Sequence, residues 1–194
     1  MKNKAAKAFA NAWKGKGYEK GETQRFWTTL LRDVLGVERP EERILFEERV
    51  KVDRFASKGS QTNFIDARIP ETKVLIEQKS SDVDLRAPIR QADGFLLTPY
   101  QQAKKYANSL PYSERPRWIV TCNFKEFLIY DMETPNSEPV DISIDDFETE
   151  AYRLEFLVKF QDEAIIRETQ ISIQAGEIVV KLYDALRRGY VHPD

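Results

Sequence analysis

The sequence is poor in the side chains that most hydrolases use as nucleophiles and general bases. Its 194 residues contain one cysteine and one histidine. Disulfide frameworks and cysteine-based zinc sites both bring several thiols together, so a single cysteine excludes them. Cys122 lies in the apolar run WIVTCNF and is interpreted as a buried structural thiol, because the only imidazole, His192, stands in the C-terminal tail. Ser-His and Cys-His hydrolase chemistry is therefore excluded.

The sequence also has no long apolar run. A transmembrane helix needs about 18 or more consecutive apolar residues, and no such stretch occurs. Residues 1–17 are basic, but they lack the apolar stretch and the small-residue cleavage site of a secretory signal. With 41% hydrophobic and 32% charged residues, the composition is typical of a globular protein. We therefore expect a cytoplasmic protein with no membrane partner.

Positive charge is not in excess either, because the formal net charge is -2. Sequence-independent affinity for DNA comes from Lys and Arg side chains that displace phosphate counterions. If this chain acts on DNA, we expect other parts of a larger protein to hold it there. Residues 131–150 contain eight Asp or Glu and no Lys or Arg. We interpret them as a solvated acidic loop that faces away from phosphate.

The apolar patterns that the sequence does contain predict one α/β (α+β) domain, with a mixed sheet flanked by helices. Helices are expected over residues 4–13, 22–35 and 99–108, and connecting loops over 14–21 and 80–97. Strands are expected over residues 44–53, 63–69, 73–79, 117–123 and 126–131, the first three as a meander and the last two as a hairpin. Thr98, Pro99 and Gln101 provide a capping box for the third helix.

The C-terminal part of the sequence follows a different pattern. From residue 144 onward the apolar spacing is helical, and it continues almost to the end of the chain. This apolar helical face has nothing further in the sequence to pack on, which indicates contact with another domain or partner. We therefore predict a main domain over residues 1–149 and a helical connector over 150–194.

The segment FIDARIPETKVLIEQKS contains the residues with the clearest chemical pattern. If residues 70–73 form a four-residue loop, Ile69 pairs with Val74, and counting outward places Asp66 opposite Glu77. Side chains alternate along a strand, so the hairpin residues divide between two faces. One predicted face is apolar: Ile65, Ala67, Ile69, Val74 and Ile76. The other is mostly polar: Phe64, Asp66, Arg68, Leu75, Glu77 and Lys79.

The facing carboxylates of Asp66 and Glu77 indicate a metal site. Their Cβ atoms are expected about 5 Å apart, and a hard divalent cation such as Mg²⁺, or Mn²⁺ in its place, relieves their repulsion by binding both through oxygen. Lys79 would lie beside the metal, where its ammonium orients the attacking water or stabilises charge on a phosphate. The alternative is an exposed salt-bridged patch, because Asp followed by Glu-x-Lys is a loose pattern.

Two residues of the third helix are candidates for supporting this site. Gln102 and Tyr106 are four residues apart and therefore share a helix face. Lys104 and Lys105 lie nearby and are weak candidates for contact with phosphate. The alternative for this helix is a solvated element that packs on the domain through Tyr100, Ala103 and Ala107.

An upstream acid is a further candidate for the metal site. Glu22 lies one turn before the apolar stripe of the second helix, from which it can reach the metal. Its alternative role is to stabilise the positive N-terminus of that helix, in which case Glu19 or Glu47 takes the metal role. The sequence leaves the choice among the three acids open.

Three blocks of the sequence resemble a known family. The order helix, meander, helix, strand, with Asp66, then Glu77-Gln78-Lys79, then Gln102-x-x-x-Tyr106, resembles the PD-(D/E)XK nuclease superfamily and its RecB-like branch. The segments FIDARIPETKVLIEQKS, LTPYQQAKKYANSLP and RPRWIVTCNFKEFLIYDM resemble the N-terminal nuclease region of MmeI-like type IIL restriction-modification enzymes. The likeness extends to QRFW and LGV upstream and to AGEIVVKLYDAL downstream. Ile65 stands where the superfamily name has proline.

This resemblance implies a Mg²⁺-dependent endonuclease acting on double-stranded DNA, with Asp66 and Glu77 as metal ligands and Lys79 as the catalytic lysine. In that family the nuclease is fused to a helical spacer, an adenine-specific DNA methyltransferase that uses S-adenosylmethionine, and a target-recognition domain. The sequence shows no Asn-Pro-Pro-Tyr type motif, and its only Gly-x-Gly precedes no cofactor-binding turn. We therefore expect S-adenosylmethionine and these domains to belong to other parts of a parent enzyme.

Two functions follow as hypotheses. The first is an endonuclease module, which the presence of Asp66, Glu77 and Lys79 favours. The second is a catalytically silent nuclease-like scaffold that binds DNA or protein. Since one centre hydrolyses one phosphodiester, cleavage of both strands would require a transient dimer or sequential nicking.

Overall fold

The computed structural model describes residues 2–53, 60–91, 94–159, 175–176 and 178–183. The chain divides into two compact units, Met1–Lys159 and Phe160–Asp194. Residues 150–159 lie in the first unit, although the sequence pattern places them in the connector. In the second unit, residues 175–176 and 178–183 are helical, and the rest of the predicted connector lies outside the described residues. No helix among these described ranges is long and apolar enough to cross a membrane.

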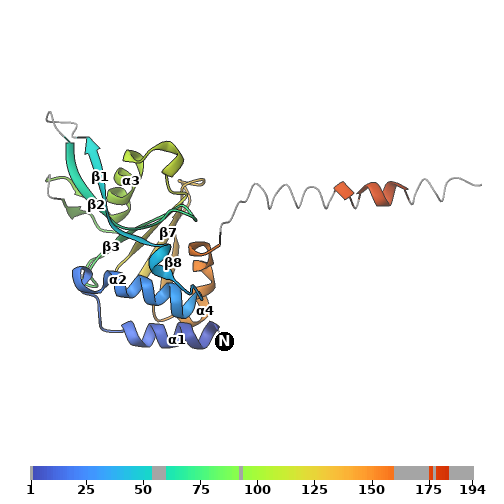
Figure 1. Cartoon of the computed structure of the whole chain (residues 1–194), viewed down its shortest axis with the longest axis horizontal. Coiled ribbons are helices and arrows are strands. Elements are labelled where there is room, and N and C mark those ends of the chain that lie inside the picture. The colour runs from blue at the N-terminus through green and yellow to red at the C-terminus, as the bar shows by residue number, and fades with distance from the viewer. Residues whose placement is uncertain (1, 54–59, 92–93, 160–174, 177, 184–194) are drawn as a thin grey trace, which may run out of the picture. The chain divides into compact units, whose positions relative to one another are not determined.

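The first unit is built on a six-stranded mixed sheet, which confirms the predicted architecture (Figure 1). Its strands, in spatial order, are β1 (Leu45–Asp53), β2 (Ser60–Ile69), β3 (Val74–Gln78), β6 (Trp118–Cys122), β7 (Glu126–Asp131) and β8 (Val140–Ser143). The pair β3 and β6 is parallel, and every other neighbouring pair is antiparallel. The predicted meander and hairpin are therefore confirmed.

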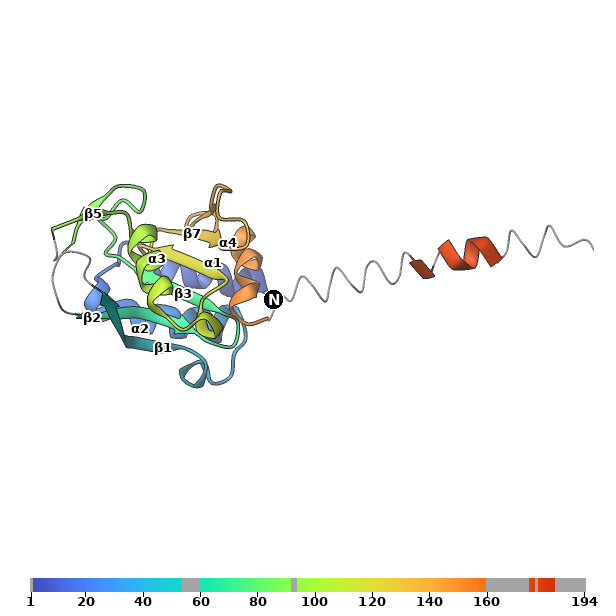
Figure 2. The ribbon, with the colours of Figure 1, turned by 90° about the horizontal axis from the view of Figure 1, so that it is seen from above.

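Helices cover both faces of the sheet. The helices are α1 (Lys2–Trp13), α2 (Glu19–Thr29), α3 (Pro99–Ser109) and α4 (Phe147–Glu150), with a π-helical turn over Leu30–Val34 and 3-10 turns over Pro40–Glu42, Tyr112–Glu114 and Ala151–Leu157. Figures 1 and 2 show α1, α2 and α4 on one side of the strands and α3 on the other. The larger core lies under α1 and α2 and includes an aromatic cluster of Phe9, Trp13, Phe26, Phe124, Phe127 and Phe147.

The predicted apolar face of the β2–β3 hairpin is confirmed for Ala67, Ile69, Val74 and Ile76, but its assignment of Ile65 is wrong, and the other face is not simply polar. Ile65 and Leu75 pack together with Ala103 of α3 in a second core, whereas Ala67 and Ile69 belong to the larger one. In β2 the alternation changes between Ile65 and Ala67, opposite Glu47 of β1. The backbone of Glu47 has a φ of 52°. A residue in this left-handed region bends its strand, so side-chain alternation does not continue across it. Both faces of the hairpin are therefore buried.

Other differences concern element boundaries. Helix α2 begins at Glu19 rather than at residue 22, and its last turns become π-helical. The predicted loop over 80–97 contains a small two-stranded sheet, β4 (Ile89–Arg90) and β5 (Leu96–Leu97). The acidic stretch over 131–150 is not simply a solvated loop, because it includes β8, with Ile142 buried, and α4, with Phe147 buried.

Candidate active site

The predicted carboxylates lie at the open end of the β2–β3 hairpin. The predicted register is confirmed, since Ile69 pairs with Val74 and the ladder continues to Ala67 with Ile76. One step beyond this last pair, Oδ2 of Asp66 accepts a hydrogen bond of 2.7 Å from the backbone N–H of Gln78. The Asp66 carboxylate thus joins the two strands where their backbone pairing ends.

Glu77 and Lys79 form a buried ion pair next to Asp66. Glu77 is 1% exposed, and its Oε1 lies 2.5 Å from Nζ of Lys79, whose side chain is 13% exposed. The second oxygen of Glu77, Oε2, is buried and has no hydrogen-bond partner among the described residues. A buried polar atom without a partner is rare in proteins and costs free energy. We name Asp66, Glu77 and Lys79 together the Asp66 cluster.

Burial shifts the pKa values of this cluster. It raises the pKa of Asp66 to about 6, against the attraction of Lys79. It also raises the pKa of Glu77 to about 8, and the negative charge of Asp66 adds to this rise. Burial disfavours the Lys79 ammonium, but the attraction of Glu77 and Asp66 outweighs it and raises the Lys79 pKa. Two desolvated carboxyl groups therefore share one lysine, and a further cation beside them would favour their ionised forms.

The Asp66 cluster fits a magnesium ion better than a metal that requires a complete protein cage. Among the described residues, no three His, Cys, Asp or Glu side chains are grouped so that they could hold a metal together. Mg²⁺ is commonly bound through one or two carboxylates, with water and substrate phosphate as its other ligands. Asp66 together with the unpartnered Oε2 of Glu77 provides such a pair.

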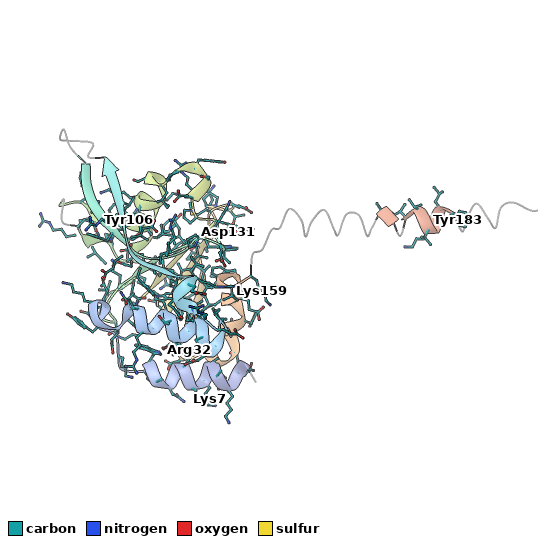
Figure 3. The ribbon with its side chains drawn as sticks, in the orientation of Figure 1. Lys7, Arg32, Tyr106, Asp131, Lys159 and Tyr183 are labelled. Carbon is teal, nitrogen blue, oxygen red and sulfur yellow. The ribbon has the colours of Figure 1, made fainter. Side chains whose placement is uncertain are left out.

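Helix α3 places Gln102 and Tyr106 together, as their spacing predicts. Nε2 of Gln102 donates a hydrogen bond of 3.0 Å to the hydroxyl of Tyr106, which is 7% exposed. Burial and the nearby negative charge of Glu77 raise the pKa of this hydroxyl. Tyr106 therefore lies within electrostatic range of the cluster, on the α3 side of the sheet (Figure 3).

The packing alternative for α3 is also confirmed. Ala103 and Ala107 are buried in the second core, and Tyr100 packs against it. Nζ of Lys104 lies 5.5 Å from the centre of the Tyr100 ring. Lys105 is half-buried. Tyr106 is also buried in this second core, and Gln102 is hydrogen-bonded to it. The supporting role of Gln102 and Tyr106 at the Asp66 cluster stays a prediction.

The structure separates the three upstream acids. Oε2 of Glu22 accepts hydrogen bonds from the backbone N–H groups of Gly17 (2.9 Å) and Tyr18 (2.8 Å), at the start of α2. Glu22 is therefore not brought to Asp66 and has the helix-terminus role given above as its alternative. By contrast, the charges of Glu19 and Glu47 contribute to the raised pKa of Asp66. These two acids line a cavity of about 270 Å³ beside Asp66.

Sequence reasoning gave no role to Gln78, which contacts the cluster directly. Gln78 is fully buried, and its side-chain amide is hydrogen-bonded to both Trp27 and the backbone carbonyl of Lys79. A signal was present in the alternation of β3, because Gln78 follows Val74 and Ile76 on the side that packs in the larger core. A polar residue in that position predicts a hydrogen-bonding role.

Comparison with protein families matches residues 4–189, nearly the whole chain, to the family described as MmeI, N-terminal domain. Comparisons with curated proteins and with solved structures gave no match. The family match confirms the resemblance that the three sequence blocks indicate. The chain therefore belongs to the MmeI N-terminal domain family, a family of restriction-enzyme domains.

Proposed function

We propose that this chain is a Mg²⁺-dependent DNA endonuclease module, with Asp66, Glu77 and Lys79 as its catalytic centre. The observation that carries the proposal is the unpartnered Oε2 of Glu77, buried beside the carboxylate of Asp66 and the ammonium of Lys79. A buried carboxylate pair with one open oxygen is costly in a purely structural role and is suited to binding a cation.

Asp66 and Glu77 are the residues that would hold Mg²⁺, and Mn²⁺ would occupy the same ligands. When bound, the metal supplies a Lewis acid that polarises the scissile phosphodiester and lowers the pKa of an attacking water. The hydrogen bond from Gln78 N–H fixes one oxygen of Asp66 and leaves the other available. The Lys79 ammonium fixes Oε1 of Glu77 and leaves Oε2 available.

Lys79 would act on the substrate itself. Its backbone N–H donates to the carbonyl of Cys122 at 2.7 Å, which anchors the residue to the end of β6. Its ammonium is kept protonated by two carboxylates, so it can donate to a phosphate oxygen and stabilise the charge that develops there during hydrolysis. Tyr106, hydrogen-bonded to Gln102, would support this end of the site from α3.

The proposed substrate is double-stranded DNA. The helical spacer, the adenine-specific methyltransferase with its S-adenosylmethionine, and the target-recognition domain of the parent enzyme would supply site selection and most of the affinity. Because this chain has one centre and a net charge of -2, we expect weak DNA binding by itself, and double-strand cleavage through a transient dimer or sequential nicks.

The test is nicking of supercoiled plasmid by the 194-residue chain at high protein concentration and low salt, with Mg²⁺ or Mn²⁺. We expect metal-dependent nicking that falls by at least about 100-fold in Lys79→Ala, because a preorganised charge in such a site contributes that much. The exposed Glu138→Gln is the matched control and should retain activity. Nicking that is unchanged in Lys79→Ala would contradict the proposal.

Metal titration by calorimetry separates this function from the scaffold hypothesis. We expect binding of Mg²⁺ or Mn²⁺ that disappears in Asp66→Asn, since that change removes one of the two carboxylates. DNA or protein binding that responds neither to metal nor to substitutions in the Asp66 cluster would instead assign the chain a scaffold role.

A further inference from the structure

Gln78, between the two charged residues Glu77 and Lys79, is a polar residue with no exposed surface. Its side chain interacts with the thiol of Cys122 and makes two further hydrogen bonds. Oε1 accepts from Nε1 of Trp27 in α2 at 2.8 Å, and Nε2 donates to the backbone carbonyl of Lys79 at 3.1 Å. Trp27 is also fully buried, so this contact links the interior of α2 to the backbone that carries Lys79.

The backbone of Gln78 contacts the third member of the cluster. Its N–H donates to Oδ2 of Asp66 at 2.7 Å. The β2–β3 ladder ends at the pair Ala67 and Ile76, so beyond it the Asp66 carboxylate, rather than a β2 carbonyl, receives this N–H. Gln78 therefore connects three things: the carboxylate of Asp66, the main chain of Lys79 and the helix α2.

Packing alone does not explain this residue. A buried amide costs free energy unless its hydrogen bonds are made, and an apolar side chain of similar size would fill the same space but leave the buried indole N–H of Trp27 without an acceptor. What an apolar side chain cannot do is hold the Lys79 carbonyl and the Trp27 indole in fixed positions. Groups that orient the residues of a site in this way are commonly hydrogen-bonded to them from behind.

A second set of contacts ties the approach to α2 to the residues that follow Lys79. The backbone N–H of Ser81 donates to the carbonyl of Gly17 at 3.0 Å, and the N–H of Glu19 donates to Oγ of Ser80 at 3.4 Å. A Cβ atom on Gly17 would lie 2.3 Å from Cβ of Ser81. The chain is thus hydrogen-bonded to α2 before Lys79, through Gln78, and to the start of α2 and the residues preceding it after Lys79, through Ser80 and Ser81.

We propose that Gln78 is a positioning residue, which sets the Asp66 carboxylate and Lys79 relative to each other by anchoring the end of β3 to Trp27. This inference rests on the proposed nuclease function. A positioning residue acts through the geometry of other groups, so its loss lowers the rate of the chemical step without changing affinity for DNA.

The test compares Gln78→Met with Thr72→Val in plasmid nicking. Gln78→Met retains the side-chain volume and removes the side-chain hydrogen bonds to Trp27 and Lys79. Thr72→Val removes one buried hydrogen bond, from Oγ1 to the carbonyl of Leu157 at 3.2 Å, in the turn at the other end of the same hairpin. We expect kcat to fall by about 10- to 100-fold in Gln78→Met with KM for DNA unchanged, and both constants to stay near wild type in Thr72→Val. Equal kcat values in the two variants would overturn the inference.

Trp27→Phe keeps the test decisive if Gln78→Met does not fold. This change keeps an aromatic ring in the core and removes the indole donor together with one ring of the indole, so kcat is compared per folded molecule. We expect kcat to fall in Trp27→Phe, and to fall no further when Gln78→Met is added to it, because both changes break the same link. A Trp27→Phe variant with wild-type kcat would overturn the inference.

A readout other than cleavage separates failure of the inference from failure of the proposed function. The chain has three tryptophans, Trp13, Trp27 and Trp118. On titration with Mg²⁺ we expect the indole N–H resonance of Trp27 to shift more than the other two, and this difference to disappear in Gln78→Met. If Mg²⁺ binds and plasmid is nicked while the Trp27 resonance stays unmoved, the positioning role alone is wrong. If the wild-type chain neither binds metal nor nicks plasmid, both proposals are wrong.

Discussion

Two clusters of charged residues are centred two residues apart on β2, one around the buried Arg68 and one around Asp66, and they differ in how completely their polar atoms are hydrogen-bonded. In the first, which we name the Arg68 cluster, Nε and Nη2 of Arg68 donate to the two oxygens of Glu48, each at 2.8 Å, and Nη1 donates to Glu114 at 3.0 Å. This bidentate arrangement uses all three guanidinium nitrogens. Each guanidinium nitrogen of Arg68 is therefore hydrogen-bonded to a carboxylate, and the Arg68 cluster gives no indication of a further ligand.

The Asp66 cluster has the same count of two acids and one base but remains open. Its base is a lysine, whose single ammonium occupies one oxygen of Glu77 and leaves Oε2 without a partner. Burial raises the pKa of both Asp66 and Glu77, and for Glu77 the negative charge of Asp66 adds to the rise. The comparison teaches that burial and ion pairing alone do not identify a site. The unpartnered Oε2 of Glu77 is what favours a metal-binding role for the Asp66 cluster over the Arg68 cluster.

The largest expected difference between the clusters is in catalysis. Glu77→Gln keeps an oxygen for Lys79 but removes the charge, and we expect nicking to fall between about 100- and 1000-fold. Glu48→Gln makes the same chemical change in the Arg68 cluster, and the folded variant should cleave within about twofold of wild type. Rates per folded molecule from plasmid nicking check both. Equal losses in the two variants would remove the distinction between the clusters.

A second difference is expected in stability. Arg68→Met removes the guanidinium from Glu48 and Glu114, and because both acids are partly exposed to solvent we expect a loss of about 2 kcal/mol rather than that of a fully buried pair. Lys79→Met should cost less in the metal-free protein, because Asp66 and Glu77 can take up protons in its absence. Urea denaturation at neutral pH measures both free energies of unfolding. A smaller loss in Arg68→Met than in Lys79→Met would reverse the comparison.

The smallest expected effect is a pH dependence confined to the Asp66 cluster. An acid whose pKa is higher in the folded than in the unfolded state binds more protons when folded, so the free energy of unfolding falls as pH rises between the two values. For Asp66 that window runs from its ordinary value, 3.8, to about 6. Asp66→Asn should therefore gain about 2 kcal/mol relative to wild type between pH 4 and pH 7 without metal. Thermal unfolding across this range, with Glu138→Gln as control, measures the gain. An equal gain in the control would contradict it.

Local patterns were sufficient to predict the hairpin that carries the site. The register of Ile69 with Val74 follows from the loop length and from alternation within one short segment. The capping box of Thr98 and Gln101 is likewise a local signal, and both of its hydrogen bonds are present. The chemistry of Asp66, Glu77 and Lys79 could be proposed because these residues lie on adjacent strands of one hairpin.

Features that depend on distant segments could not be predicted in the same way. The face on which Ile65 packs changes at the bend in β1 at Glu47, a residue nearly twenty positions earlier in the sequence. Strand β8 contains only Val140 and Ile142 as apolar residues within an acidic stretch, too few for a strand signal without its partner β7. Whether Glu22 lies near Asp66 depends on where α2 begins, because a start at Glu19 places the Glu22 carboxylate on the backbone N–H groups of Gly17 and Tyr18. The spacing of apolar residues does not specify that start.

The hydrogen bond between Asp66 and Gln78 has a consequence for how the proposed activity could be lost in this fold. Asp66 is both a proposed metal ligand and the group that closes the last gap between β2 and β3, so replacing it with a residue that cannot accept a hydrogen bond would damage the sheet as well as the chemistry. Lys79 contributes no such link through its side chain, which among the described residues is hydrogen-bonded to Glu77, its neighbour on the same strand end. In descendants that drift toward a silent scaffold, the lysine should therefore be lost before the aspartate.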